Sequence, residues 1–351
     1  MRRLCKDLAI LPASRCNGGT GALACPREPR LRWSGQTRVS SLRIGLLAVA
    51  SLLLAGGMTL DYAKPGDTAA APAAGSVDAS KLRTARQSSS DLEVGGELAG
   101  MPRGVTRYIT REDLLALPQL TYTVADDPNF AGPTTISGVA LADLAASLAA
   151  APQAAMVVAI CDDKYRANYP REYIAAHRPL LVLTVNGQPP SGWPKDSEGH
   201  GYDMGPYMIS HPQFAPSFKV FSHADEPQIP WGVVKIEFRD ENMVFGAIAP
   251  PGHSSEPLVK AGYRIAQQNC FRCHNMGREG GQKSGVPWQA LSARAAASPE
   301  YFAAYVRDPL SRNPHAEMPG NSGYDDATLG ALVAYFRTFS AHPPRETQGR
   351  P

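Results

Sequence analysis

The feature that most constrains the fold of this 351-residue chain is the motif Cys270-Phe271-Arg272-Cys273-His274. Two thiols separated by two residues can each form a thioether with one vinyl group of a haem, and the adjacent histidine can then bind the iron. A zinc site would need a second pair of ligands, and a redox dithiol would need a βαβ context. The sequence offers neither, so the motif predicts one covalently attached haem c, held by Cys270 and Cys273 with His274 as an axial iron ligand.

The segments around this motif have the apolar spacing of helices. A helix is predicted over 256–269, leading into the motif, and another begins at Ser298 and Pro299, which suit the N-cap and the first turn. A third is predicted over about 325–340, where the apolar residues form one stripe. We therefore expect an all-α domain over 258–342.

Several helices around one CxxCH motif, within fewer than about a hundred residues, resemble the class I cytochrome c fold. In that family a small residue of the first helix lets an aromatic residue of the last helix cross closely. The resemblance assigns these roles to Gly262 and to Tyr335 or Phe336. It also implies that haem attachment takes place outside the cytoplasmic membrane.

The second axial ligand is expected to be Met318. It precedes Pro319 in a loop some forty residues after His274, and so resembles the distal-ligand loop of class I cytochromes c. A thioether ligand raises the reduction potential relative to two imidazoles, which suits an electron carrier. The alternatives are His315, or an iron site that is open or otherwise filled. Met276 is too close to His274 to reach the opposite face of the haem.

The N-terminal 43 residues form a basic leader. They contain nine lysine and arginine residues against Asp7 and Glu28, whereas the whole chain has a formal net charge of +3. The rest of the chain is therefore slightly acidic, which removes the main support for nucleic-acid binding. Because about forty residues is long for the basic region of a signal peptide, we expect that translation starts downstream, for example at Val39 if its codon is GTG.

Residues 44–60 form an uncharged apolar run behind Arg43, and the polar Ala/Pro/Gly-rich stretch 61–91 that follows is expected to be a flexible linker. This pattern is typical of a secretory signal or a short N-terminal membrane anchor, and it fits a buried core helix poorly. The run is at the lower limit of the length that spans a bilayer. We expect a periplasmic protein, soluble or anchored to the cytoplasmic membrane by this segment.

Residues 92–250 mix short strands and short helices, which indicates an α+β domain. A capped helix is predicted at 110–115 and a second helix over 141–150. Strands are predicted over 120–124, 156–160, 180–185 and 233–238. Residues 251–257, which are rich in Pro, Gly and Ser, are expected to form the interdomain linker.

This domain also resembles the molybdopterin-binding domain of sulfite-oxidase-like proteins. Short segments at 136–144, 163–165, 185–189 and 205–208 follow in the order seen in that family. The family has a molybdenum-ligating cysteine shortly before the segment that matches Gly138, whereas 125–130 here reads Ala-Asp-Asp-Pro-Asn-Phe. An arginine common after the Gly-Pro pair is replaced by Met208. The resemblance therefore implies the family's fold with a degenerate metal site, and it argues against bound molybdopterin.

The remaining candidate ligands of this domain are expected to be structural. Cys161, the domain's one cysteine, follows an apolar strand and is expected to be a small buried hydrophobe. The polar stretch between Pro189 and Trp231 holds three histidines, His200, His211 and His223. Their spacing matches no metal signature, so we expect solvated loop residues and assign no catalytic residue.

These features favour an exported monohaem c-type cytochrome that transfers electrons to or from redox partner proteins. The degenerate molybdopterin-type domain would then bind or dock another molecule. One alternative is a periplasmic oxidoreductase whose middle domain oxidises a small substrate and passes electrons to the haem. A second is a sensor or peroxidase with an open iron site. We expect an electron-transfer protein rather than a catalyst.

Overall fold

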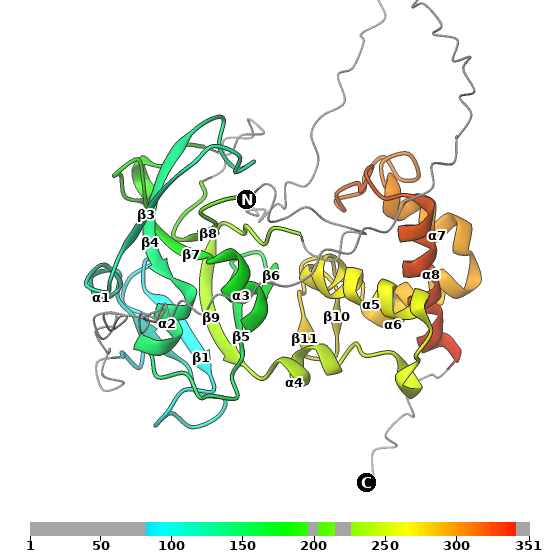
Figure 1. The fold of residues 1–351 in the computed structure, drawn as a ribbon, viewed down its shortest axis with the longest axis horizontal. Helices are drawn as coiled ribbons and strands as arrows, with labels where there is room; N and C mark the ends of the chain where they lie inside the picture. Colours follow the sequence, from blue (N-terminus) through cyan, green and yellow to red (C-terminus); the bar gives the residue numbers. More distant parts are fainter. Residues whose placement is uncertain (1–81, 196–202, 215–225, 342–351) are drawn as a thin grey trace, which may run out of the picture. The chain divides into compact units, whose positions relative to one another are not determined.

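A computed structural model of the chain describes residues 82–195, 203–214 and 226–341 (Figure 1). The basic leader, the apolar run 44–60 and most of the linker 61–91 lie outside the described residues, as do His200 and His223. Among the helices that the structure describes, none is both long enough and apolar enough to cross a membrane.

The first sheet of the middle domain has five strands in the order β2-β1-β9-β5-β6. β1 and β9 run parallel, and the other neighbouring strands are antiparallel. The sheet therefore joins a strand from the start of the domain to one from its end. Its strands are β1 (Leu92–Gly96), β2 (Arg107–Ile109), β5 (Met156–Cys161), β6 (Arg166–Pro170) and β9 (Val233–Arg239).

The second sheet is antiparallel and has the order β3-β4-β7-β8. A register shift between Ser137 and Gly138 marks a bulge in β4. A side chain at Gly138 would place its Cβ 2.0 Å from the carbonyl oxygen of Leu181, so the close approach of β7 requires glycine here. Its strands are β3 (Leu120–Val124), β4 (Thr134–Ala140), β7 (Leu180–Val185) and β8 (Met208–Ser210).

Short helices connect the strands of these sheets. The Thr110 side chain accepts a hydrogen bond from the backbone N–H of Asp113 and so caps α1, as the sequence predicts. The second predicted helix is shorter than expected and ends at Ser147. The helices are α1 (Arg111–Leu115), α2 (Leu141–Ser147), α3 (Arg171–His177) and α4 (Glu241–Gly246), all labelled in Figure 1.

Residues 82–91, which composition assigns to the linker, pack against the first sheet. Leu82 is buried in the core of the middle domain. The backbones of Arg83 and Tyr108 exchange two hydrogen bonds of 2.9 Å. The Asp91 carboxylate accepts the N–H groups of Gln87 and Ser88 at 2.8 and 3.0 Å. This part of the chain is therefore tied to β2.

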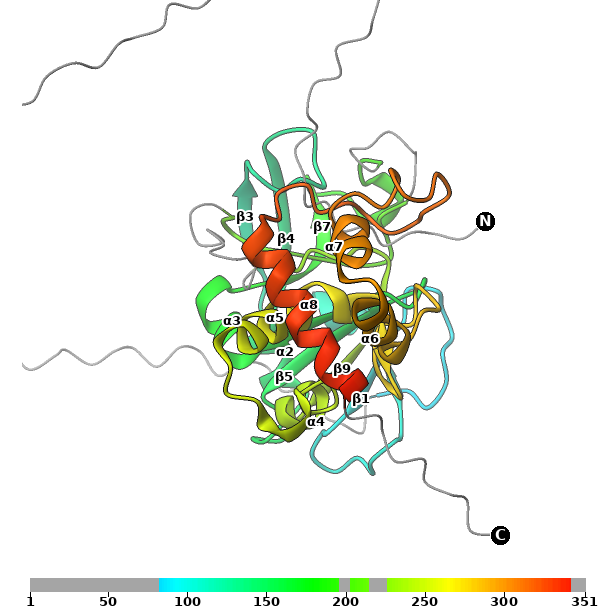
Figure 2. The ribbon, with the colours of Figure 1, turned by 90° about the vertical axis from the view of Figure 1, so that its right-hand side faces the viewer.

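The C-terminal part is helical around the CxxCH motif. α8 contacts α5, α6 and α7, and Figure 2 shows it running across them. α5, α7 and α8 confirm the predicted helices, but the side chain of Ser298 makes no capping hydrogen bond to α7. The helices are α5 (Pro257–Gln268), α6 (Trp288–Ala297), α7 (Pro299–Arg307) and α8 (Asp326–Ala341).

The crossing of α5 and α8 occurs at Gly262, as the resemblance implies. A Cβ there would lie 2.1 Å from the carbonyl oxygen of Ala331 and 2.6 Å from the Cβ of Tyr335. The aromatic residue on the glycine is thus Tyr335 rather than Phe336. Tyr335 is fully buried, and its hydroxyl donates to the carbonyl oxygen of Ile248 at 2.5 Å. The crossing therefore also fixes the segment that leads into α5.

The helical domain shares a hydrophobic core with the middle domain. Met156 and Val158 of β5 and Phe245 of α4 belong to the same buried cluster as the residues of α5 to α8. The Tyr263 hydroxyl donates to the carbonyl oxygen of Phe245 at 2.8 Å. The apolar surface of the helices is thus buried partly against the first sheet.

Candidate haem-binding site

The haem-attachment turn, Cys270–His274, begins directly after α5 with the 3₁₀ segment η4 (Cys270–Arg272). The N–H of His274 donates to the carbonyl oxygen of Cys270 at 3.0 Å and closes the turn. Phe271 is fully buried, with its ring centroid 5.5 Å from that of Trp288. Phe271 anchors the turn in the core, whereas Cys270 and Cys273 on either side of it are only half-buried.

The two cysteines face different surroundings. Cys270 packs on the core of the helical domain, whereas Cys273 packs on the core of the middle domain. The pKa of Cys270 is raised to about 12, mainly by desolvation of the sulfur; the charges of Cys273 and Glu226 contribute to the rise, and the charge of Arg272 opposes it. Free Cys270 is therefore a neutral thiol in the folded chain.

A short hairpin, β10 (Asn275–Met276) and β11 (Glu279–Gly280), folds back over the attachment turn. A Cβ at Gly281 would lie 1.7 Å from the carbonyl oxygen of Arg272. One at Gly280, where φ is +91°, would lie 2.4 Å from the carbonyl oxygen of His274. Only glycine at both positions lets the hairpin lie this close to the turn.

His274 is held by the chain that follows it. Its Nδ1 atom lies 2.8 Å from the carbonyl oxygen of Val286 and 2.8 Å from the hydroxyl of Ser284. Because both oxygens can accept, the proton belongs on Nδ1, and Nε2 carries the lone pair that a metal needs. Burial lowers the pKa of His274, which the bond to Val286 partly opposes and the charge of Arg294 reinforces. The imidazole is therefore neutral at pH 7, the form that ligates iron.

The two candidates for the second axial ligand occupy different environments. Met318 is half-buried and packs on the same core cluster as Cys270. His315 is exposed, and its backbone N–H donates to Oδ1 of Asn313 at 3.0 Å. The Met318 loop (residues 309–320) is tied back to α7 by Asn321, whose N–H donates to the carbonyl oxygen of Arg307 at 2.9 Å. The fold thus places Met318 against the hydrophobic core of the helical domain and leaves His315 in solvent.

Met276 has its own structural partner. It is half-buried, and its sulfur accepts a hydrogen bond from Nε2 of Gln289 at 3.0 Å. It lies in β10, two residues after His274, in the hairpin that covers the attachment turn. The exclusion of Met276 as the opposite ligand stays a prediction from its spacing to His274.

The expectation of a solvated His211 is wrong. His211 directly follows β8 and is fully buried, with Nε2 3.0 Å from the Tyr173 hydroxyl. The Tyr173 hydroxyl also accepts the N–H of Gln228 at 2.8 Å. Burial lowers the pKa of His211 well below its usual value, and the charge of His177 adds to this effect. The polar sequence around it suggested a loop because β8 is only three residues long.

Residues 125–130, where the resemblance would place a molybdenum-ligating cysteine, contain the buried carboxyl group of Asp127. Asp127 accepts hydrogen bonds from the Ser210 hydroxyl and from the N–H of Asn129, the latter at 2.9 Å. Burial raises the pKa of Asp127 to about 6, although both bonds oppose the rise. Cys161 is buried at the end of β5, as expected. Within the described part of the chain, no three His, Cys, Asp or Glu side chains are grouped to hold a metal.

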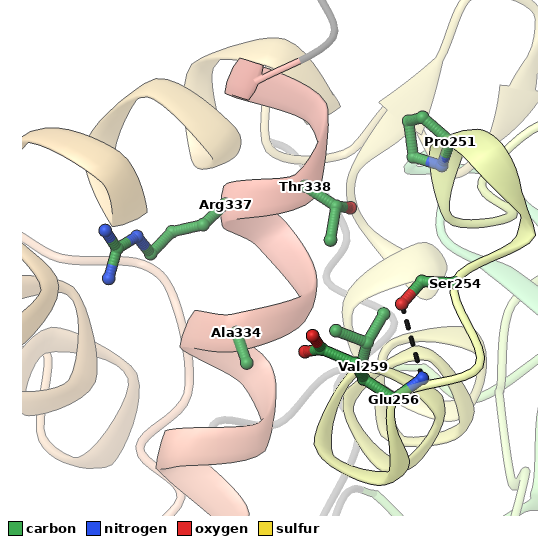
Figure 3. A pocket seen from close by; sticks show the side chains of 7 residues that line it. All are labelled: Pro251, Ser254, Glu256, Val259, Ala334, Arg337 and Thr338. Atoms are coloured by element: carbon green, nitrogen blue, oxygen red, sulfur yellow. Dashed lines mark hydrogen bonds between the residues drawn. The ribbon is translucent and has the colours of Figure 1, made fainter.

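An open cavity of about 440 Å³ lies where α5 and α8 meet the segment before α5. Figure 3 shows its lining, in which the Ser254 hydroxyl accepts the N–H of Glu256 and the Arg337 side chain extends away from Glu256. Val259 and Cys270 are eleven residues apart along the chain, about 16 Å at helical rise. This cavity is therefore separate from the attachment turn.

Comparison with known proteins agrees with the helical part of this description. Residues 257–336 match a family described as cytochrome C oxidase, cbb3-type, subunit III. These residues form a cytochrome c domain, which implies a covalently bound haem c. No curated protein matches the sequence.

Among solved structures, the chain is similar to the sulfane dehydrogenase SoxCD from Paracoccus pantotrophus. The sequence identity is 17% and the TM-score is 0.29. The similarity covers 45% of this chain and 40% of that chain.

Proposed function

We propose that this protein is an exported electron carrier with a single haem c. Cys270 and Cys273 form the two thioethers, and His274 and Met318 are the axial ligands of the iron. The observation that carries this proposal is the orientation of the buried His274 imidazole, whose Nδ1 faces the carbonyl oxygen of Val286. A histidine with its Nδ1 proton engaged presents Nε2 in the form that binds metal.

The chain's own residues serve electron transfer by fixing the surroundings of the iron. The haem supplies one-electron chemistry when bound. Phe271 and Trp288 exclude water from the side of the attachment turn that faces the core. The thioether of Met318 favours the reduced iron and so raises the potential. His274 and Met318 would hold the iron in both of its oxidation states, so electron transfer would need little rearrangement of the chain.

Attachment through both thiols is tested by the haem content of purified protein. The wild type is expected to carry one haem per chain that stays bound after denaturation, as measured by mass spectrometry and by the pyridine haemochrome spectrum. Cys270→Ala and Cys273→Ala are expected to lose a thioether and to load poorly. Cys161→Ala, at the buried end of β5, is the matched control and should load fully. Full covalent loading of either CxxCH variant would contradict the assignment.

Export to the periplasm is part of the proposal. The cytochrome c type of the helical domain and the apolar run at 44–60 both favour it. The protein is then soluble, or anchored through the apolar run, and meets redox partner proteins there. Sequencing of the N-terminus of the mature protein distinguishes cleavage near the small residues Ala55, Gly56 and Gly57 from an intact anchor. A peptide from residues 1–38 in the precursor would exclude a downstream start.

For the middle domain we propose a sulfite-oxidase-like fold that has lost molybdenum. Residues 125–130 provide no thiolate, and the Asp127 carboxylate already accepts hydrogen bonds from Ser210 and Asn129. These residues do not fit a molybdenum site, so no reaction step is assigned to one. The domain then acts in binding or docking. Metal analysis of the holoprotein should find one iron and no molybdenum, and stoichiometric molybdenum or pterin fluorescence would overturn this part.

One observation favours the second candidate, an oxidoreductase whose middle domain oxidises a small substrate. The buried pair His211–Tyr173 is connected through Gln228 to Gln268, since Nε2 of Gln228 donates to Oε1 of Gln268 at 2.8 Å. Gln268 ends α5, two residues before Cys270. A hydrogen-bonded path therefore runs from a buried polar cluster to the attachment turn. Substrate-dependent reduction of the haem, lost in Tyr173→Phe, would establish this candidate over the carrier.

A further inference from the structure

Glu279 joins the attachment hairpin to the first sheet of the middle domain. One carboxylate oxygen lies 2.9 Å from Nη2 of Arg166, and the other lies 2.5 Å from Nη2 of Arg239. The side chain of Arg166 is only 5% exposed, and those of Arg239 and Glu279 are 26% and 18% exposed. A carboxylate between two arginines, largely out of water, differs from a surface ion pair because removal of one partner leaves a buried charge uncompensated.

Further acidic and basic side chains of the first sheet pair with one another beside Glu279, so that opposite charges offset each other. Arg239 also pairs with Glu237 at 3.1 Å, and Lys235 pairs with Glu237 and Glu93 at 2.9 Å. Burial lowers the pKa of Arg166, and the charge of Glu279 opposes this shift. Removing the Glu279 charge would leave Arg166 as a buried cation without its carboxylate, which is the costly way to break such a pair.

The residues after Glu279 contact the turn between β5 and β6. The N–H of Gln282 donates to the carbonyl oxygen of Lys164 at 3.1 Å. Lys283 pairs with Asp163 at 3.1 Å, and its ammonium lies 5.6 Å from the ring centroid of Tyr165. The β5–β6 turn (residues 162–165) is therefore fastened to the chain just beyond the CxxCH motif by backbone, charge and aromatic contacts.

We propose that Glu279 is a positioning residue that docks the attachment turn onto β6 and the β5–β6 turn. This proposal rests on the proposed haem attachment at Cys270 and Cys273. Since Cys273 packs on the core of the middle domain, docking covers the Cys273 side of the haem. External redox partners then exchange electrons at another side, where the Met318 loop is exposed. The middle domain is thus a fixed cover for the haem and not a flexibly tethered neighbour.

The first test is amide hydrogen exchange of the holoprotein carrying Glu279→Gln. Peptides covering 277–285 and 161–167 should exchange faster, with the opening equilibrium raised about tenfold to hundredfold, because the ion pair with Arg166 and the charge-assisted hydrogen bond from Arg239 are lost or weakened. Glu300→Gln, at the exposed start of α7, is the matched control and should not change these peptides. Unchanged exchange in Glu279→Gln would overturn the proposal.

A double-mutant cycle separates docking from a general loss of stability. Glu279→Gln and Arg166→Met should be strongly non-additive in the exchange of 277–285, because either change breaks the same pair. Arg166→Lys keeps the positive charge, so residues 277–285 should be better protected from exchange in this variant than in Arg166→Met. If Glu279→Gln does not fold, Arg239→Gln leaves the Arg166 pair in place and should give a smaller increase. Additive effects in the cycle would overturn the proposal.

The functional measurement is the second-order rate constant for reduction of the ferric protein by ascorbate. Uncovering the Cys273 side should raise it severalfold in Glu279→Gln and leave it unchanged in Glu300→Gln. An equal rate constant in Glu279→Gln would overturn the covering role. The haem content of each variant is measured in parallel. Absence of covalent haem in the wild type would refute the proposed function, whereas full loading with unchanged exchange refutes the docking alone.

Discussion

The Nδ1 atom of His274 lies 2.8 Å from the carbonyl oxygen of Val286, twelve residues further along the chain. The segment between them folds as the β10–β11 hairpin and returns to the imidazole. The orientation of the iron ligand therefore depends on residues outside the CxxCH motif. The Ser284 hydroxyl takes part, since it accepts the N–H of Val286 at 3.0 Å and lies 2.8 Å from the same Nδ1.

Ser284→Ala is expected to raise the reduction potential of the haem. With one acceptor fewer for the Nδ1 proton, the imidazole becomes a weaker donor, and the ferric iron loses stabilisation. The free energy of unfolding should fall by about 0.5–1.5 kcal/mol for the lost hydrogen bonds. Redox titration of the holoprotein measures the potential, and Ser322→Ala in an exposed loop is the control. A potential equal to that of the wild type would show that Ser284 only supports the backbone.

Gly262→Ala is expected to destabilise the helical domain. The added Cβ would meet the carbonyl oxygen of Ala331 at 2.1 Å and so force α5 and α8 apart, at a cost of about 1–3 kcal/mol or more. Gly330→Ala is the matched control, because a Cβ there meets nothing within 4 Å. It should stabilise α8 by about 0.5–1 kcal/mol through helix propensity. Thermal unfolding followed by circular dichroism measures the stability of both variants. Equal melting temperatures for Gly262→Ala and Gly330→Ala would contradict the close contact of α5 and α8 at Gly262.

The helical domain was the more predictable part of the fold. The CxxCH motif and the apolar stripes of α5, α7 and α8 are local patterns, so they can be recognised without the rest of the chain. α6 has no such pattern, since its sequence is rich in alanine and its apolar residues do not concentrate on one face. It is identified by its packing, since Trp288 is buried and its ring centroid lies 4.9 Å from that of Phe336.

The parts of the site that were missed depend on contacts between distant segments. β6 is buried along its whole length and includes Arg166 and Asn168, so it shows neither alternation nor an apolar run. The partner of Arg166 is Glu279, which looks like an ordinary loop residue in the sequence. His211 is buried for the same reason, because its surroundings come from α3 and from residues after 225. Tertiary packing, and not local sequence, determines these environments.

Met318→Ala is expected to keep the haem attached but to lower the reduction potential. Loss of the thioether removes a ligand that favours ferrous iron. The near-infrared band of methionine-ligated ferric haem should disappear, while His315→Ala, at an exposed position in the same loop, should leave it intact. Optical spectroscopy measures the band, and redox titration measures the potential, in each variant. A high-spin ferric spectrum in the wild type would contradict the ligation and favour an open iron site.

Asp127→Asn is expected to stabilise the middle domain above about pH 6. Burial is the main cause that raises the pKa of Asp127 from 3.8 to about 6, so the folded chain favours the protonated form. The stabilising contribution of the group is complete below pH 3.8 and is lost as the pH rises through about 6. The full effect is about 2–3 kcal/mol at 1.36 kcal/mol for each pKa unit. An asparagine carries no charge at any pH, so the variant should lack this loss. Urea unfolding at pH 4 and pH 7 measures the difference, with Glu300→Gln as the control. If wild type and Asp127→Asn show the same change in unfolding free energy between the two pH values, Asp127 does not titrate in this range.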